Sequence, residues 1–395
     1  MSDEYALVLN AGSSSLKFSL YERSQRAAWQ VAAGGQMDGI GTTPRFVVRG
    51  RDGEPLSDEP LDLAVASDAR AAARRVLSWV RGRGAGVIAV GHRVVHGGAA
   101  YGAPCLVTRD VLDDLQGLIP LAPLHQPSSL DVIEEVSAEL PGIPQVACFD
   151  TSFHRGRSPV ATLVPLPKAI RDAGVERYGF HGLSYEYIAS VLSAVAPDVA
   201  DGRVIVAHLG NGASLCALRS RKSVDTTFGF TALDGLCMGT RPGSLDPGVV
   251  LHLFKELGRS AVEVEHILYE QSGLRGISGI SNDMRDLLAS ADPAARLAVD
   301  YFVYQAAKHV GALAAVLGGV DALVFTAGIG EHSAEIRRRI SEASAWLGVE
   351  LDADANAAHA PRISRAASPV AVLVVPTDEE LMIARHMDAV LSRSA

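Results

Sequence analysis

The amino-acid sequence predicts an α/β fold with a duplicated domain, and three observations lead to this prediction. Six short apolar runs look like buried strands that end on small or polar residues, and helical patterns lie between them. A strand, a Gly/Ser-rich turn and a second strand occur at residues 7–21 and return at 204–218, about half of the 395-residue chain later. The predicted strands are residues 6–9, 87–90, 146–149, 204–206, 322–325 and 370–375.

The first predicted strand runs into a turn that is suited to phosphate. Residues 12–17 read Gly-Ser-Ser-Ser-Leu-Lys and lack the glycine directly before the lysine that a P-loop requires. Residues 18–21 alternate like a strand, so we expect a β-hairpin whose amides and hydroxyls contact phosphate. Asn10 at the strand end would be available to a metal ion. Residues 204–218 predict a second such hairpin, although Gly/Ser turns between strands are common.

Helix signals separate the strands. Ser67-Asp68 can cap a helix whose apolar positions recur at helical spacing over residues 69–80. Asp292-Pro293 offers the start of a longer helix, and Gly318-Gly319 ends it. Residues 34–62 are rich in Gly, Asp, Pro and Arg, and they predict a region of hairpins and loops.

Composition excludes several classes of protein. The net charge of −9 with no basic run argues against nucleic acid as a partner. The acidic start at residues 1–4 lacks the features of a signal peptide, and residues 310–325 are too broken by Gly and Asp to span a bilayer. The four cysteines are widely spaced, which disfavours a zinc site or a disulfide framework and favours the cytoplasm. They are Cys105, Cys148, Cys216 and Cys237.

Five charged or titratable side chains are candidates for chemistry. Arg93 and Arg241 each lie near glycines, where a guanidinium can approach a carboxylate or a phosphate closely. His181, in Tyr-Gly-Phe-His-Gly, could donate a hydrogen bond to a transferring phosphoryl group. Asp150 and Glu379 follow two predicted strands and could organise Mg²⁺ or position a nucleophile. Taken singly, such residues are also common as surface ion pairs, structural histidines and helix caps.

Together these motifs closely resemble the acetate and propionate kinase family, within the superfamily of acetate and sugar kinases, Hsp70 and actin. The resemblance covers essentially the whole chain. It implies two duplicated ribonuclease H-like (actin-like ATPase) domains with the active site in the interdomain cleft. We expect one domain at 1–151 plus 380–395 and a nucleotide-binding domain at 152–379. The motifs are residues 10–17, 91–98, 149–151, 178–182, 208–214, 229–246, 283–285, 328–331 and 377–381.

The resemblance implies a homodimer that transfers the ATP γ-phosphoryl group directly to acetate, with Mg²⁺ or Mn²⁺. On this interpretation Asn10 and Glu379 are the metal-site residues, while Arg93 and Arg241 bind the carboxylate and steady the phosphoryl group. Asp150 is the active-site acid, and His181 donates a hydrogen bond in the transition state. The implied ATP-binding residues are Lys17, His208, Leu209, Gly210, Asn211, Gly212, Asp283, Met284, Arg285, Gly328, Ile329, Gly330, Glu331 and His332.

By the same resemblance the acyl group contacts Val95, Leu124, Phe180 and Ala232, and the family often has proline at the last position. The smaller Ala232 would leave room for another methylene, so we expect appreciable use of propionate. The chain also departs from the family pattern at Gln126, His332, Asp378 and the Leu-Ser-Tyr of residues 183–185.

Three other activities stay open at this point. Propionate could be the main substrate. An actin- or Hsp70-like ATPase would also carry two phosphate hairpins, but it would not need two arginines beside an apolar pocket. A sugar kinase would need a catalytic base and a polar pocket. Asp150 could be that base, but the apolar pocket residues argue against a sugar.

Overall fold

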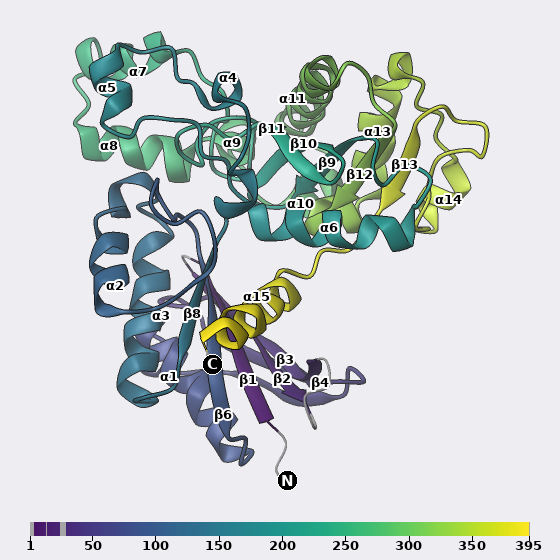
Figure 1. Ribbon diagram of the computed structural model, residues 1–395. Coiled ribbons are helices and arrows are strands. Elements are labelled where there is room, and N and C mark those ends of the chain that lie inside the picture. The colour runs from purple at the N-terminus through teal and green to yellow at the C-terminus, as the bar shows by residue number, and fades with distance from the viewer. Residues whose placement is uncertain (1–3, 13, 24–28, 395) are drawn as a thin grey trace. The chain divides into compact units, whose positions relative to one another are not determined.

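The computed structural model describes residues 4–12, 14–23 and 29–394, and the chain divides into two compact units. Unit 1 comprises Met1–Ser152 and Asp378–Ala395, and unit 2 comprises Phe153–Thr377 (Figure 1). Ser13 of the predicted phosphate turn and residues 1–3 of the N-terminal segment lie outside the described residues. Within the described ranges, no helix is both long and apolar enough to cross a membrane.

Unit 1 is built on an eight-stranded sheet in the order β5-β4-β3-β2-β1-β6-β8-β7. The strands β1, β6 and β8 run parallel, and the remaining pairs are antiparallel. The strands are β1 (Glu4–Ala11), β2 (Ser15–Arg23), β3 (Gln30–Asp38), β4 (Arg45–Gly50), β5 (Pro55–Pro60), β6 (Val87–Val94), β7 (Cys105–Leu106) and β8 (Gln145–Phe149).

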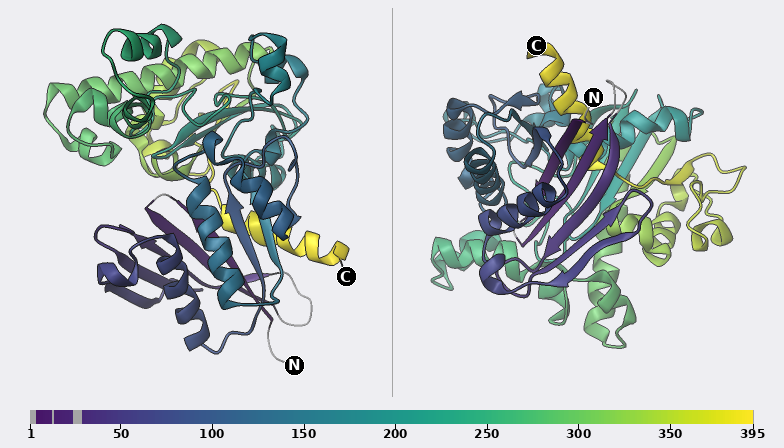
Figure 2. Two further views of the ribbon diagram at one scale, coloured as in Figure 1. Left: turned by 90° about the vertical axis from the view of Figure 1, so that its left-hand side faces the viewer. Right: turned by 90° about the horizontal axis from the view of Figure 1, so that it is seen from below.

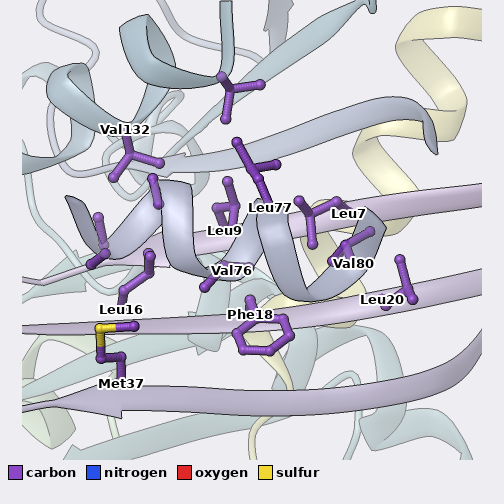
Figure 3. Close-up of a cluster of buried hydrophobic side chains, with 14 of the residues drawn as sticks. Leu7, Leu9, Leu16, Phe18, Leu20, Met37, Val76, Leu77, Val80 and Val132 are labelled. Atoms are coloured by element: carbon purple, nitrogen blue, oxygen red, sulfur yellow. The ribbon is translucent and has the colours of Figure 1, made fainter. Parts of the chain in front are cut away.

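Helices cover both faces of this sheet. On one face, α1 (Ala69–Gly82) and α3 (Gln126–Glu139) bury an apolar core against alternate strand residues such as Leu7 and Phe18 (Figure 3). On the other face, the C-terminal helix α15 (Glu379–Ser394) packs against β1, β6 and β8 (Figure 2). A Cβ added at Gly91 of β6 would lie 2.6 Å from Ile383 Cγ2, so this glycine lets α15 approach closely. A further helix is α2 (Arg109–Gln116).

Unit 2 contains a five-stranded sheet in the order β11-β10-β9-β12-β13. The strands are β9 (Arg203–Leu209), β10 (Ala213–Arg219), β11 (Lys222–Thr226), β12 (Ala322–Thr326) and β13 (Ala371–Val374). Helix α6 (Gly182–Val195) packs its Tyr185, Ile188 and Leu192 into the sheet core. The other helices are α4 (Pro159–Thr162), α5 (Lys168–Asp172), α7 (Pro247–Lys255), α8 (Ala261–His266), α9 (Gly273–Ser278), α10 (Met284–Ala289), α11 (Pro293–Leu317), α12 (Ala327–His332), α13 (Ala334–Ala343) and α14 (Ala353–Ala357).

The two sheets share one topology. In unit 1 the run β3-β2-β1-β6-β8 has two antiparallel hairpin pairings followed by two parallel pairings. In unit 2 the run β11-β10-β9-β12-β13 repeats this order and these directions. The predicted α/β class, the six strands and the duplicated hairpins are confirmed.

Two predicted helix ends are also confirmed. The Asp68 side chain accepts from the Ala71 N–H at the start of α1, and Asp292 accepts from the Ala294 N–H at the start of α11. Gly318 ends α11 in the left-handed conformation, with a φ of 72°.

The hairpins expected within residues 34–62 are confirmed, because most of these residues lie in the antiparallel neighbours β3, β4 and β5. One expectation differs from the structure. The expected domain boundary placed Ser152, Asp378 and Glu379 in the second domain, whereas all three belong to unit 1. Helix α15 begins at Glu379 and packs on β6 and β1. Because of this packing, the first residues of α15 belong to unit 1.

Two buried histidines should make the stability of the protein depend on pH. Burial lowers the pKa of His92 to about 4, and burial followed by the charge of Arg157 lowers the pKa of His154 to about 3. A histidine in the unfolded chain has a pKa of about 6.5, so the unfolded state takes up protons first as the pH falls. We therefore expect each histidine to lower the free energy of unfolding by about 2 kcal/mol between pH 7 and pH 5.

Urea titrations of the wild type at the two pH values would measure this loss. His92→Gln and His154→Gln should each shrink the difference between pH 7 and pH 5, while His332→Gln, at an exposed side chain, should leave it unchanged. An undiminished difference in both buried-site variants would contradict the assignment.

Candidate active site

One set of predicted residues meets at the carboxyl ends of the parallel strands in unit 1. Asn10 lies at the end of β1, Arg93 at the end of β6, and Asp150 directly after β8. Because these strands are parallel neighbours, their carboxyl ends lie together. Glu379 and Glu380 reach the same place from the first turn of α15. We call these five residues the carboxylate cluster.

Arg93 is the centre of the carboxylate cluster. Its Nε and Nη2 donate to the Asp150 carboxylate, with an Nη2–Oδ2 distance of 2.6 Å, and its Nη1 donates to Asn10 Oδ1 at 3.1 Å. The Asn10 amide in turn donates to Glu380 Oε1 at 3.0 Å and to Glu379 Oε2 at 3.3 Å. Asp150 is buried and paired in a bidentate manner, so its visible role is to orient Arg93.

The charge balance of the carboxylate cluster favours an added cation. Burial raises the pKa of Glu379 to about 7, with Asp150 and Glu380 adding to the rise and Arg93 opposing it. Burial alone would lower the pKa of Arg93, but Asp150 and Glu379 raise it above its ordinary value. Lys17 pairs with Asn10 across β1 and β2 and adds a nearby positive charge.

The donor set fits Mg²⁺ in its usual protein setting. The part of the chain that the structure describes holds no group of three acidic, His or Cys ligands arranged for a metal. Mg²⁺ in phosphate chemistry needs no such cage, because one or two carboxylates, waters and the substrate phosphates complete its shell. Glu379 and Asn10 offer this kind of partial site.

A second set of predicted residues meets in unit 2, at the turn between β9 and β10. His181 precedes α6 with a φ of 57°, and its ring stacks on the His208 ring with centroids 4.0 Å apart. A Cβ added at Gly212 would lie 2.8 Å from Arg241 Nη2 and 3.2 Å from His181 Nε2. Both side chains therefore converge on the backbone of this turn. We call His181, His208, Gly212, Ser214 and Arg241 the histidine cluster.

Buried side chains hold the chain segment before His181. His154 Nε2 lies 3.0 Å from the carbonyl oxygen of Phe180, and Arg157 Nη2 donates to the carbonyl oxygen of Tyr178 at 2.6 Å. His181 has a left-handed backbone, which costs energy in a residue other than glycine, and these contacts hold the turn in place. The sequence motif named His181, but nothing in it identified His154 or Arg157.

The three predicted ATP-binding segments of unit 2 lie at the end of β9 and its following turn, at the start of α10, and in α12. Asn211 packs over Gly239, where a Cβ would lie 1.9 Å from Asn211 Oδ1, and Asn282 donates to the same oxygen. Asp283 caps α10, which carries Met284 and Arg285. Residues 328–332 belong to α12, with Ala327 before them at a φ of 64°.

Glu331, one of the predicted ATP-binding residues, has a structural role. Its carboxylate accepts from the backbone N–H groups of Ala327 and Thr377. Its visible role is to tie two strand-end loops together. His332 exposes most of its side chain.

The predicted acyl-pocket residues are divided between the units. Val95 is buried and Leu124 half-buried in unit 1, while Phe180 and Ala232 are buried in unit 2. The carbonyl oxygen of Ala232 accepts from Arg241 Nη1 at 2.8 Å, so the residue at position 232 also supports the arginine.

Two departures from the expected motifs have structural roles. Gln126 is fully buried, accepts from the His96 N–H and donates to the His96 carbonyl oxygen, both at 3.1 Å. Asp378 caps α15 by accepting from the Leu381 N–H. Three site residues were not predicted from the motifs, although they lie beside predicted residues in the sequence. They are Ser214, Glu380 and Ser184, whose Oγ lies 2.8 Å from His208 Nδ1.

Nearly the whole chain matches the model of a protein family. The model of the Acetokinase family covers residues 5–385. The acetate kinase of Nitrobacter hamburgensis is 53% identical over 391 residues, which span 98% of this chain and 97% of that protein.

Solved structures agree with this match. The acetate kinase of Porphyromonas gingivalis superposes with a TM-score of 0.84 at 35% identity, over 98% of this chain and 100% of that one. A propionate kinase from Francisella tularensis gives 0.89 at 35% identity with the same coverage.

Proposed function

Because this chain belongs to the acetokinase family, it catalyses phosphoryl transfer between ATP and acetate, and we propose that its carboxylate and histidine clusters both take part. The observation that carries this proposal is the convergence of Arg241 and His181 on the β9–β10 turn. In the forward direction a carboxylate oxygen of acetate attacks the γ-phosphorus, the bond to ADP breaks, and acetyl phosphate forms.

The carboxylate acceptor explains why the site needs cations rather than a base. A carboxylate is ionised at neutral pH, so no proton has to be removed before attack. The barrier is instead the repulsion between the acetate anion and the charged phosphate. Arg93 and Arg241 can neutralise this charge, and Asp150 keeps Arg93 oriented, so Asp150 acts through the arginine.

Asn10 and Glu379 would hold Mg²⁺, while the segments at 208–212, 283–285 and 328–332, with Lys17, would contact ATP. Bound Mg²⁺ supplies neutralisation of phosphate charge. The Nε2 atom of His181 faces Gly212. In this position its N–H can donate to the oxygens of the transferring phosphoryl group. Since ATP is the phosphoryl donor, we place the enzyme in the cytoplasm.

Trapping of the acyl phosphate with hydroxylamine tests the proposed function. The purified protein is supplied with Mg²⁺-ATP and with formate, acetate, propionate or butyrate in turn, and the hydroxamate is measured. We expect product with acetate and a smaller amount with propionate. Faster turnover of propionate would make it the main substrate. Release of ADP with no hydroxamate from any acid would instead support an ATPase.

Ala232 should set the balance between acetate and propionate. Replacing it with proline adds volume at the expected acyl pocket, so we expect Ala232→Pro to lower the propionate-to-acetate ratio of kcat/KM by roughly 10-fold or more, the value of one methylene. Leu288→Ala, at an exposed residue of α10, serves as the control. An unchanged ratio in a folded Ala232→Pro protein would refute this role.

We also infer a homodimer that forms through unit 2. An apolar cavity of about 420 Å³ there includes Leu163, Leu245 and Val250 in its lining. Exposed apolar side chains are present in the same stretches of chain, and they are Val160, Val249, Leu251, Leu257 and Val262. Exposed apolar residues in such number commonly mark a protein interface.

Light scattering after gel filtration should therefore give about twice the chain mass of 41.5 kDa. Val262→Asp should shift the mass toward the monomer, because a buried charge at an interface is costly. Val316→Asp, at an exposed residue of α11, should leave the dimer intact. A monomeric wild type would contradict the inference.

A further inference from the structure

A buried hydroxyl pair lies behind the His181 ring. His181 Nδ1 is 2.9 Å from Ser214 Oγ, and Ser214 Oγ is 2.5 Å from the Tyr185 hydroxyl. Tyr185 and Ser214 are both completely buried. The three side chains thus form a chain of contacts that leads from α6 through β10 to the ring.

Counting donors fixes the direction of this chain. The buried Tyr185 hydroxyl has a single hydrogen that needs an acceptor, and Ser214 Oγ is its hydrogen-bond partner among the described residues. Ser214 then accepts from Tyr185 and has one hydrogen of its own, for which His181 Nδ1 is the partner. The reverse direction would leave the phenol hydrogen buried and unsatisfied, which is costly.

We propose that Tyr185, acting through Ser214, holds the neutral His181 ring in the tautomer that carries its proton on Nε2. Tyr185 and Ser214 are positioning residues, because neither faces the Gly212 backbone to which His181 Nε2 points. Burial raises the pKa of Tyr185 well above its ordinary value, which keeps the phenol protonated as a donor.

The consequence for the reaction rests on the proposed function. A ring that accepts at Nδ1 presents an N–H at Nε2, on the side of Gly212 and Arg241. This is the atom that would donate to the phosphoryl oxygens as their charge develops. The opposite tautomer would present a lone pair there and repel the phosphate.

Nuclear magnetic resonance of the full-length protein with ¹⁵N-labelled histidine rings tests the proposal directly. Long-range ¹H–¹⁵N correlations distinguish a protonated ring nitrogen from an unprotonated one, and the signals missing from a His181→Gln variant belong to His181. We expect an unprotonated Nδ1 and a protonated Nε2 in the wild type. A proton on Nδ1 in the neutral ring would overturn the proposal.

Tyr185→Phe removes only the hydroxyl. Ser214 then becomes free to accept from His181, so we expect part of the population to move its proton to Nδ1. The kcat should fall by about 10-fold, the equivalent of one hydrogen bond, with KM values nearly unchanged. Tyr187→Phe removes a second phenol hydroxyl from α6, outside this chain of contacts, and should behave as the wild type.

Two results separate this proposal from the proposed function. If Tyr185→Phe keeps the wild-type tautomer, Tyr185 does not set it, and Ser214→Ala provides the same test should the first variant fail to fold. If His181→Ala retains normal hydroxamate formation, the catalytic role of His181 fails while the measured tautomer stands by itself.

Discussion

Arg241→Ala is expected to lower kcat by roughly 10²- to 10³-fold, the loss seen when one preorganised donor to a developing charge is removed. Arg241 lies against the β9–β10 turn opposite His181, and one of its nitrogens is held by the Ala232 carbonyl oxygen. This contact fixes the direction of the guanidinium before the reaction, so the group does not have to reorganise when charge develops on the phosphoryl oxygens. Because the interaction is made in the transition state, kcat and kcat/KM should fall together.

The hydroxamate assay measures this loss, and circular dichroism confirms that the variant is folded. Arg259→Ala removes an arginine that precedes α8 and forms an exposed ion pair with Glu263 of that helix, and it should leave turnover unchanged. Arg93→Ala should lose a similar factor in rate and also some stability, because it leaves the buried Asp150 without its partner. Near-normal turnover of a folded Arg241→Ala protein would remove the arginine from the mechanism.

Gly212→Ala is expected to lower kcat by about 10²-fold with little change in the melting temperature. The new Cβ would lie 2.8 Å from Arg241 Nη2 and 3.2 Å from His181 Nε2, so the methyl group would occupy the space between the two. The end of the arginine can swing away, which spares the fold. A displacement of about 1 Å at the reacting groups costs a factor of this size.

A matched substitution separates this steric effect from the general cost of replacing a glycine. A Cβ at Gly82, near the end of α1, would meet nothing within 4 Å, so Gly82→Ala should keep full activity. Steady-state kinetics and thermal unfolding of both variants test the prediction. Full activity of Gly212→Ala would show that this turn tolerates a methyl group and that the two side chains do not need their present places.

Local sequence determined the regular elements and the chemistry of the site. Asp68 and Asp292 start helices because their carboxylates accept from backbone N–H groups within the next three residues. Both the cap and its partner can therefore be read from a short stretch of sequence. The strand ends and their motifs could be predicted because each apolar run and the small or polar residues that follow it are neighbours in the sequence. They named Asn10, Arg93 and His181 without any knowledge of the fold.

Only the tertiary structure decided how these residues act together. Asn10 and Arg93 are 83 residues apart and meet because β1 and β6 pair in parallel, while Tyr185 reaches Ser214 because α6 packs on the sheet that contains β10. Burial, which raises the pKa of Glu379, likewise depends on α15 returning to the first sheet. Strand pairing, burial and donor counting depend on neighbours distant in sequence, so a local motif can name a side chain but not its partners.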